Sequence, residues 1–102
     1  MESKYKRLSE IKNSNNWFGL PKENRVSIDK LVGIEIVMME YLTTIIKGEE
    51  KLVVKFQYLD KPDEYNMFIT KSGVIKDRLN KDKEFLPFIA TIKRKGRYYY
   101  YE

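Results

Sequence analysis

An alternation of apolar and polar residues with a period of two recurs along the chain after Lys30, and this pattern restricts the fold more than any other feature. The clearest stretch is KLVVKFQYL, in which one face receives Leu52, Val54, Phe56 and Tyr58. A period of two places successive side chains on opposite faces of a strand, so that one face is buried and the other contacts water. The pattern therefore predicts an antiparallel β-protein.

Three further runs predict strands. KLVGIEIVMMEYLTTIIKGEE predicts one long first strand that bends at Gly33 or at a bulge. YNMFITK predicts a third strand, with Met67 and Ile69 in the core. The closing run, LPFIATIKRKGRYYYYE, predicts a hairpin with its tight turn at Lys95 and Gly96, because glycine supplies the positive φ that such turns need.

Two segments show other patterns. In SGVIKDRLNKDKEF the apolar residues take helical spacing after Ser72, a suitable N-cap, so a helix of about two turns is expected between the third and fourth strands. Near the N-terminus, SKYKRLSEIKN predicts a short helix from Ser3 to Asn13. WFGLPKEN then predicts an ordered loop, whose apolar residues either plug one end of a barrel or form an aromatic contact surface.

The order of three strands, a helix and two strands predicts a mainly β fold, namely a five-stranded OB-like barrel with one short helix between strands 3 and 4. A half-open sheet packed on a helix gives the same order. A chain of 102 residues fits one globular unit. We expect residues 1–28 to form the N-terminal helix and arm, and residues 29–102 to form the OB-like domain.

The chain contains no cysteine and no histidine, which excludes disulfides and thiolate zinc sites and removes the commonest general base. No carboxylate pair or glycine-rich phosphate loop stands out either. We therefore expect a protein that is not an enzyme and has no catalytic residue, metal or cofactor. No apolar run approaches the ~18 residues of a membrane span, so a cytoplasmic protein without membrane contact is expected.

The net charge of +5 is distributed unevenly. Residues 1–30 carry seven basic and four acidic groups, residues 31–70 carry four and seven, and residues 71–102 carry nine and four. A basic excess at both ends of the chain indicates a polyanionic partner, although a solvated basic face explains the same numbers.

The final RKGRYYYYE suggests how nucleic acid would bind. With a two-residue turn at Lys95 and Gly96, Ile92 pairs with Tyr99, and Tyr101 also faces the core. The other two tyrosines then point outward, where their rings can stack on bases while the basic side chains contact phosphates. A register slip of one residue would exchange the two sets. The candidate residues are Lys93, Arg94, Lys95, Arg97, Tyr98 and Tyr100.

Two more candidates lie on other strands. If Met67 and Ile69 are in the core, Phe68 points outward and offers a third stacking ring. The alternative is that Phe68 belongs to the core under the helix. Lys55 of the second strand would line the same outer face.

EYNMFITKSGVIKDRLNK followed by FLPFIATIKRKGRYYYYE resembles the C-terminal half of small OB-fold single-stranded DNA-binding proteins of phages and mobile elements. The shared pattern is an aromatic strand, a step from Thr70 to Ser72 into a short helix, a strand that follows Leu-Pro, a basic glycine turn and a tyrosine-rich last strand. The resemblance implies a protein that binds single-stranded DNA largely without sequence preference, in replication or recombination of such an element. The choice of DNA over RNA rests on this resemblance alone.

A different class of function fits the same residues. The basic aromatic face would also dock on an acidic protein surface, as in a phage-encoded inhibitor of a host nucleic-acid enzyme. It would equally serve as the interface of a homo-oligomer. The sequence leaves these alternatives open.

Overall fold

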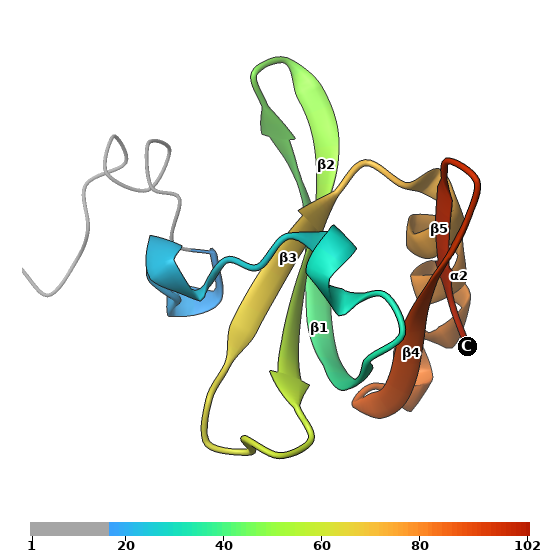
Figure 1. Cartoon of the computed structure of the whole chain (residues 1–102). Coiled ribbons are helices and arrows are strands. Elements are labelled where there is room, and N and C mark those ends of the chain that lie inside the picture. The colour runs from blue at the N-terminus through green and yellow to red at the C-terminus, as the bar shows by residue number, and fades with distance from the viewer. Residues whose placement is uncertain (1–16) are drawn as a thin grey trace, which may run out of the picture.

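Five antiparallel strands form one sheet in the order β3-β2-β1-β4-β5, in a computed structural model that describes residues 17–102 (Figure 1). The predicted helix from Ser3 to Asn13 lies outside the described residues. The strands are β1 (Glu35–Ile46), β2 (Glu49–Tyr58), β3 (Asn66–Thr70), β4 (Phe88–Lys95) and β5 (Tyr98–Tyr101). The helical elements are α2 (Gly73–Asp82) and four 3-10 turns, η1 (Trp17–Gly19), η2 (Lys22–Asn24), η3 (Ile28–Leu31) and η4 (Lys83–Phe85).

β1 begins later than predicted and bends elsewhere. Residues 28–31 form η3, and Gly33 adopts a left-handed φ of +83° in the turn that leads into the strand. The bulge lies between Met38 and Glu40, where the register with β2 shifts. A bulge bends its strand and increases the local twist. The bend allows β1 to pair with β2 along its length and with β4 at its start.

β2 confirms the predicted inner face, although Val53 on the opposite face is also 0% exposed. Leu52, Val54 and Phe56 are buried in the core, and Tyr58 packs against them. On the same inner face, α2 contributes Ile75 and Leu79, both fully buried. The helix was predicted from its spacing and its N-cap, and the Ser72 hydroxyl accepts a hydrogen bond from the Ile75 amide at 3.3 Å. It continues to Asp82 and is longer than expected.

β3 corrects the prediction for Phe68. Its side chain is 0% exposed and belongs to the core, where its ring centroid lies 5.7 Å from that of Phe56. Met67, on the opposite face, is 0% exposed as well. The N-terminal arm pairs with the edge of β3 at this residue, where the Val26 amide donates to the Met67 carbonyl at 2.8 Å. Because neighbouring residues on both faces of β3 are buried, its side chains do not alternate between core and solvent.

The β4–β5 hairpin has the predicted faces but a different turn. Ala90 and Ile92 are buried, and Ile92 lies opposite Tyr101 rather than Tyr99. The two turn residues are Gly96 and Arg97, one position later than predicted. Gly96 takes a φ of +62° at the first central position, which a type II′ hairpin turn reserves for glycine. The shift moves each pairing by two residues, so the inward and outward sets are unchanged.

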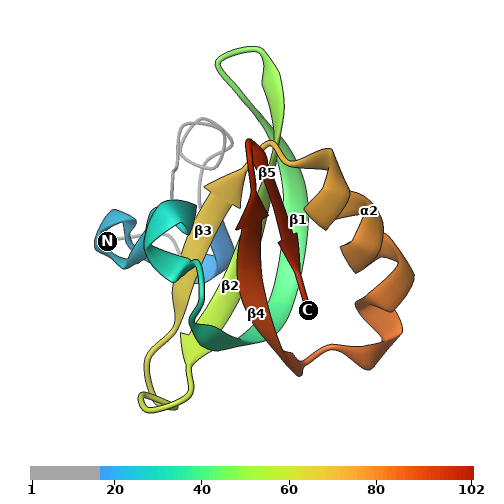
Figure 2. The same cartoon turned by 45° about the vertical axis from the view of Figure 1, so that its right-hand side comes forward.

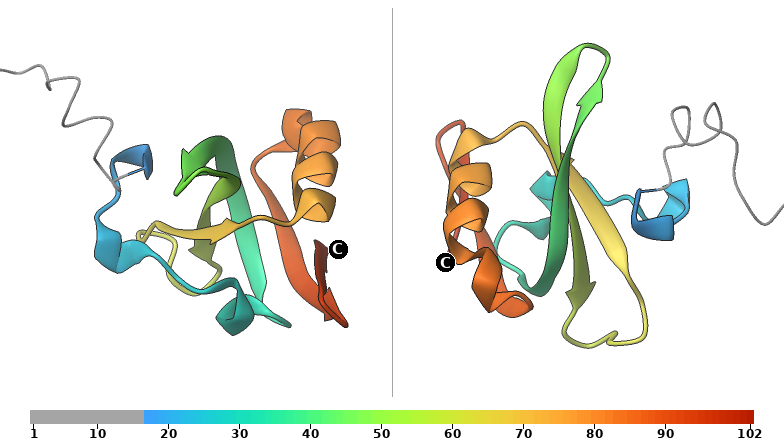
Figure 3. Two further views of the ribbon diagram at one scale, coloured as in Figure 1. Left: turned by 90° about the horizontal axis from the view of Figure 1, so that it is seen from above. Right: turned by 180° about the vertical axis from the view of Figure 1, so that it is seen from behind.

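The sheet is not closed into a barrel, which corrects the predicted closure. β3 and β5 are its two edges and share no ladder. On the β5 edge, the Ser72 hydroxyl donates to the Tyr99 carbonyl at 3.2 Å, and Arg78 Nη1 donates to the Tyr101 carbonyl at 2.6 Å. These side chains occupy acceptors that a closing β3 strand would need. α2 lies beside β4 and β5 in every view (Figures 2 and 3).

The N-terminal arm fills the opening between β3 and β4. η3 contacts both strands, and the Gly33 amide donates to the Ile92 carbonyl at 2.8 Å. Ile28 and Leu31 of this segment enter the core. The apolar residues of WFGLPKEN were one candidate for a plug, but they stay outside the core cluster, and the ring of Trp17 lies 5.2 Å from the guanidinium of Arg25.

Candidate functional site

The outer face of the β4–β5 hairpin carries two lysine–tyrosine pairs. Lys93 lies directly opposite Tyr100, and Lys95 lies opposite Tyr98. Residues opposite each other in an antiparallel ladder have Cβ atoms about 4.5–5.5 Å apart. We call these four residues the hairpin platform. The turn beside it adds a further cation, the exposed Arg97.

The tyrosine rings of the platform are available to a ligand. Tyr98 is 70% exposed and Tyr100 is half-buried. Within residues 17–102, neither ring stacks on another ring or lies under a cation. Tyr99 and Tyr101, in contrast, lie under the guanidinium groups of Arg94 and Arg78, and Tyr101 also stacks on Phe88. Only the outward pair therefore presents free ring faces.

Arg94 does not join the platform. It lies opposite Tyr99 on the other face, its side chain donates to the Gly96 carbonyl at 2.9 Å, and its guanidinium is 3.8 Å from Asp29. Tyr99 also donates its hydroxyl to Asp29. Arg94 thus connects the hairpin to the segment that contains η3. The signal was present in the sequence, since Arg94 follows Lys93 and adjacent strand residues point to opposite faces.

Two predicted site residues lie apart from the platform. Lys55 is on the outer face of β2, with its ammonium 3.4 Å from Glu40 and 4.4 Å from the centroid of the Tyr65 ring. β1 separates β2 from β4 in the sheet. Phe68 is in the core, as described above, and offers no ring to a ligand.

A row of three hollows runs beside the platform, and we call it the basic band. The first hollow, of about 470 Å³, lies between the arm and the β1–β2 turn, and it shares Lys51 with the second, of about 220 Å³. The second shares residues 70–73 with the third, of about 580 Å³, which reaches the hairpin turn at Arg97 and Tyr98. The β1–β2 turn, the β3–α2 link and the β4–β5 turn all lie at one end of the molecule (Figure 1).

Cations outnumber acids along the band. Its basic residues are Arg25, Lys47, Lys51, Lys71, Lys76 and Arg97, and its acids are Glu49, Glu50 and Asp77. Lys51 lies 3.1 Å from Glu49, and its hydrogen bond and charge, with the charge of Lys71, lower the pKa of that carboxyl. Lys76 forms an ion pair with Glu50, which raises the lysine pKa.

Four cations of the band have no ion pair with any residue of the described part. Arg25 lies over the ring of Trp17, whereas Lys47, Lys71 and Arg97 remain available to external anions. Lys47 and Lys71 were not predicted from the sequence. Both lie close to a glycine, in Lys47–Gly48 and Lys71–Ser72–Gly73, and basic residues at glycine turns are the signal that would have indicated them.

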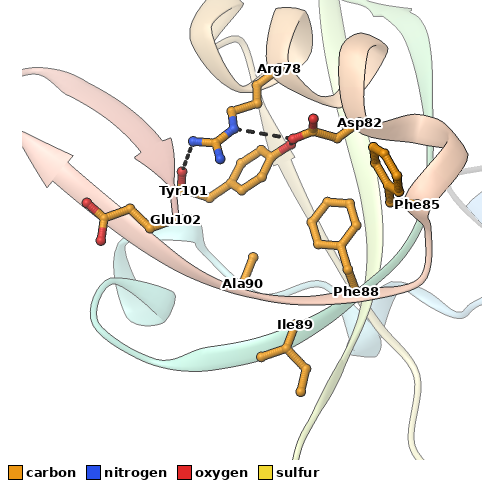
Figure 4. Close-up of a pocket in the computed structure, with 8 residues that line it drawn as sticks. All are labelled: Arg78, Asp82, Phe85, Phe88, Ile89, Ala90, Tyr101 and Glu102. Carbon is orange, nitrogen blue, oxygen red and sulfur yellow. Dashed lines mark hydrogen bonds and ion pairs between the residues drawn. The ribbon is translucent and has the colours of Figure 1, made fainter.

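A fourth hollow, of about 250 Å³, lies at the other end of β4 (Figure 4). Phe85, Phe88 and Tyr101 surround it, and the Tyr101 hydroxyl donates to Asp82 at 2.8 Å. Burial raises the pKa of Tyr101, and the hydrogen bond to Asp82 adds to the effect. Three charged residues, Arg78, Asp82 and Glu102, also line this hollow, which is separate from the predicted site.

The strand order and the cation-lined end define a mainly β protein, an open five-stranded antiparallel sheet with one helix between its third and fourth strands. Residues 22–102 match the family described as Domain of unknown function (DUF8468), and the chain belongs to that family. The match spans all five strands and α2. No curated protein and no solved structure matches the chain.

Residues 17–102 lack two other features. They contain no cluster of three or more side chains suited to hold a metal ion. None of their helices has both the length and the apolar character to cross a membrane.

Proposed function

We propose that this protein binds single-stranded DNA, largely without sequence preference, through the hairpin platform and the basic band. The role in the cell would be to protect or present the strand during replication or recombination of a phage or mobile element. The observation that carries the proposal is the platform itself, two lysine–tyrosine pairs on one face of the hairpin, of which the exposed Tyr98 borders a row of cation-lined hollows.

The chemistry of single strands supports this assignment. Their bases expose flat faces, and stacking on an aromatic side chain contributes ~1–3 kcal/mol per base. Their phosphates release counterions when lysine and arginine replace them, which adds affinity that depends on salt. The platform supplies the rings and the band supplies cations without internal partners, at the same end of the sheet.

The fold is compatible with an opened OB barrel. The five-stranded OB barrel is itself a partly open architecture whose loops 1–2 and 4–5 flank the ligand. Here the β1–β2 and β4–β5 turns flank the basic band. We propose that the sheet is an OB barrel whose seam between β3 and β5 is replaced by contacts of α2. The preference for DNA rests on the resemblance of residues 68–79 and 86–101 to phage single-strand-binding proteins.

A fluorescence-anisotropy titration tests the proposal. A labelled oligo-dT should bind much more tightly than a duplex of equal length, and log affinity should fall linearly with log salt, by ~0.7 per phosphate contact. Oligo-U of the same length serves as the RNA comparison. Duplex binding as tight as single-strand binding would refute stacking. A response that is independent of salt would refute the phosphate contacts and favour a protein-interaction module.

A further inference from the structure

The edge of β3 offers an open position for another strand. Val26 donates to the Met67 carbonyl on the side of β3 that faces away from β2. Backbone groups alternate in direction along a strand, so Ile69, two residues later, points its N–H and C=O to that same side. The arm turns away into η3 after Val26, and no backbone hydrogen bond outside the ladders reaches Ile69 from residues 17–102.

The first hollow of the basic band lies next to this open position. Ile69 lines it, together with Ile46 from the end of β1 and Arg25 from the arm. Two lysines, Lys47 and Lys51, complete its basic lining, and Glu49 is its acid. The open edge is therefore bordered by apolar contacts and by an excess of positive charge.

We propose that the β3 edge at Ile69 binds an extended acidic peptide of a partner protein, which adds to the sheet as a sixth strand. An exposed edge takes up a peptide through main-chain hydrogen bonds, and the side chains that alternate along the peptide give specificity. Carboxylates on the outward side of the peptide meet Arg25 and Lys47, while apolar residues contact Ile46 and Ile69.

The peptide site overlaps the basic band, so peptide and nucleic acid exclude each other. This consequence rests on the proposed function, whereas the peptide site does not. Carboxylates and phosphates would compete for the same cations, and a partner with an acidic segment would release the bound strand. An acidic partner would thus regulate the binding of nucleic acid at this surface.

The test is a titration of the full chain with acetyl-Asp-Val-Asp-Val-Asp-amide, followed by NMR and amide hydrogen exchange. We expect exchange of the Ile69 amide to slow by about fivefold or more, because a peptide carbonyl now accepts from it. The same peptide with methylated valine nitrogens tests the backbone bonds, and acetyl-Lys-Val-Lys-Val-Lys-amide tests the charge. Both controls should leave Ile69 unchanged.

Two variants sharpen the result. Ile69→Pro removes the edge N–H at a position where an edge strand tolerates proline, and it should abolish the NMR shift changes that the acidic peptide causes at the backbone amides of Lys47 and Lys51. Lys47→Glu should abolish them too and remains informative if the proline variant does not fold. Lys81→Glu on α2, outside the hollow, is the matched control and should respond as the parent does.

Unchanged exchange at Ile69 up to millimolar acidic peptide would overturn the proposal, and so would an equal response to the lysine peptide. A competition with oligo-dT separates the two proposals. Peptide binding without oligo-dT binding would refute the proposed function alone, and the reverse would refute the peptide site alone. If both bind, displacement of oligo-dT by the peptide is expected, and simultaneous binding would overturn the regulatory role.

Discussion

Four consecutive tyrosines of identical chemistry occupy different environments. Tyr101 is 2% exposed and Tyr98 is 70% exposed, with Tyr99 and Tyr100 between these limits. The inward or outward direction follows from strand alternation. The degree of burial follows from distance along the strand, because Tyr101 lies opposite the buried Ile92 and Tyr98 lies next to the turn. One side-chain type thus supplies both a core residue and a surface ring.

Alanine at Tyr98 and at Tyr101 should therefore give opposite results. Tyr98→Ala should weaken oligo-dT binding by ~1–3 kcal/mol and leave the melting temperature nearly unchanged. Tyr101→Ala should reduce the free energy of unfolding by ~3–5 kcal/mol, as expected for a truncated core aromatic. Anisotropy titrations and thermal melts measure both effects. Tyr98→Phe retains the ring and is the control. Parental affinity in Tyr98→Ala would show that this ring does not stack on bases.

The phenol of Tyr101 predicts a loss of stability in alkali. Burial and the hydrogen bond to Asp82 raise its pKa above the value of about 10 for an unfolded chain. Its contribution to stability is therefore complete below about pH 10 and disappears as the pH rises toward the folded pKa. Urea melts between about pH 9 and 11 should show a steeper decline for the parent than for Tyr101→Phe. Parallel declines would contradict this assignment.

At the scale of elements, α2 protects the edge of β5 as well as covering the core. Ser72 accepts from the Ile75 amide at the start of the helix and donates to the Tyr99 carbonyl. Arg78, further along the helix, donates to the Tyr101 carbonyl. Free edges invite pairing with other chains, and proteins commonly cover them with a helix. The helix therefore helps to prevent the β5 edge from pairing with strands of other chains.

Ser72 substitutions should separate its two roles. Ser72→Ala loses a helix cap, at ~1 kcal/mol, and a hydrogen bond to the sheet, at ~1 kcal/mol. Ser72→Asp retains the capping oxygen but has no proton to donate, so it should recover only the capping part. Chemical denaturation gives the free energies of unfolding. Full recovery in Ser72→Asp would indicate that the bond to Tyr99 contributes nothing.

The elements predicted best from sequence are those whose surroundings match their pattern. The core face of β2 follows its alternation, with Val53 buried in addition on the other face, and α2 has a cap followed by apolar residues at helical spacing, so both elements were predicted correctly. β3 was predicted with the wrong face because Met67 and Phe68, on opposite faces, are both fully buried, so the local pattern does not distinguish the core face. Closure of the sheet depends on side chains of α2 at the β5 edge, which strand order does not reveal.

The candidate site was predicted in part. Alternation correctly placed Tyr98 and Tyr100 on the outer face, and the same rule should have excluded Arg94. The lysines of the β1–β2 turn and the β3–α2 link could not be assigned from spacing, because three separate loops bring them together. Whether these residues bind nucleic acid stays a prediction.

At the scale of the whole molecule, the distribution of the charged residues is more informative than the net charge of +5. The basic band and the hairpin platform lie at one end of the sheet, whereas the β2–β3 loop at the other end carries Asp60, Asp63 and Glu64. Such a separation orients a polyanion as it approaches, because the field attracts it at one end and repels it at the other.

Neutral substitutions test this distribution. Lys71→Gln and Arg97→Gln, both in the band, should each reduce the slope of log affinity against log salt by ~0.7 for oligo-dT. Lys61→Gln in the β2–β3 loop removes the same charge at the opposite end and should leave the slope unchanged. Anisotropy titrations at several salt concentrations provide the slopes. Equal slopes for all three variants would mean that net charge alone, and no defined path, determines binding.

The open seam gives the fold a mechanical asymmetry. In a closed ring every strand is held by two neighbours, but here the described backbone pairing of the β4–β5 hairpin with the rest of the chain consists of residues 35–38 with residues 88–91 and of the Gly33–Ile92 hydrogen bond. The remaining attachment consists of side-chain contacts from α2 and from the segment near Asp29. We therefore expect the hairpin and α2 to open as one cooperative unit before the β1–β2–β3 meander does, with faster amide hydrogen exchange in the hairpin as the measurement. Single-stranded DNA bound at the tip of the hairpin would reduce the motions of that unit first.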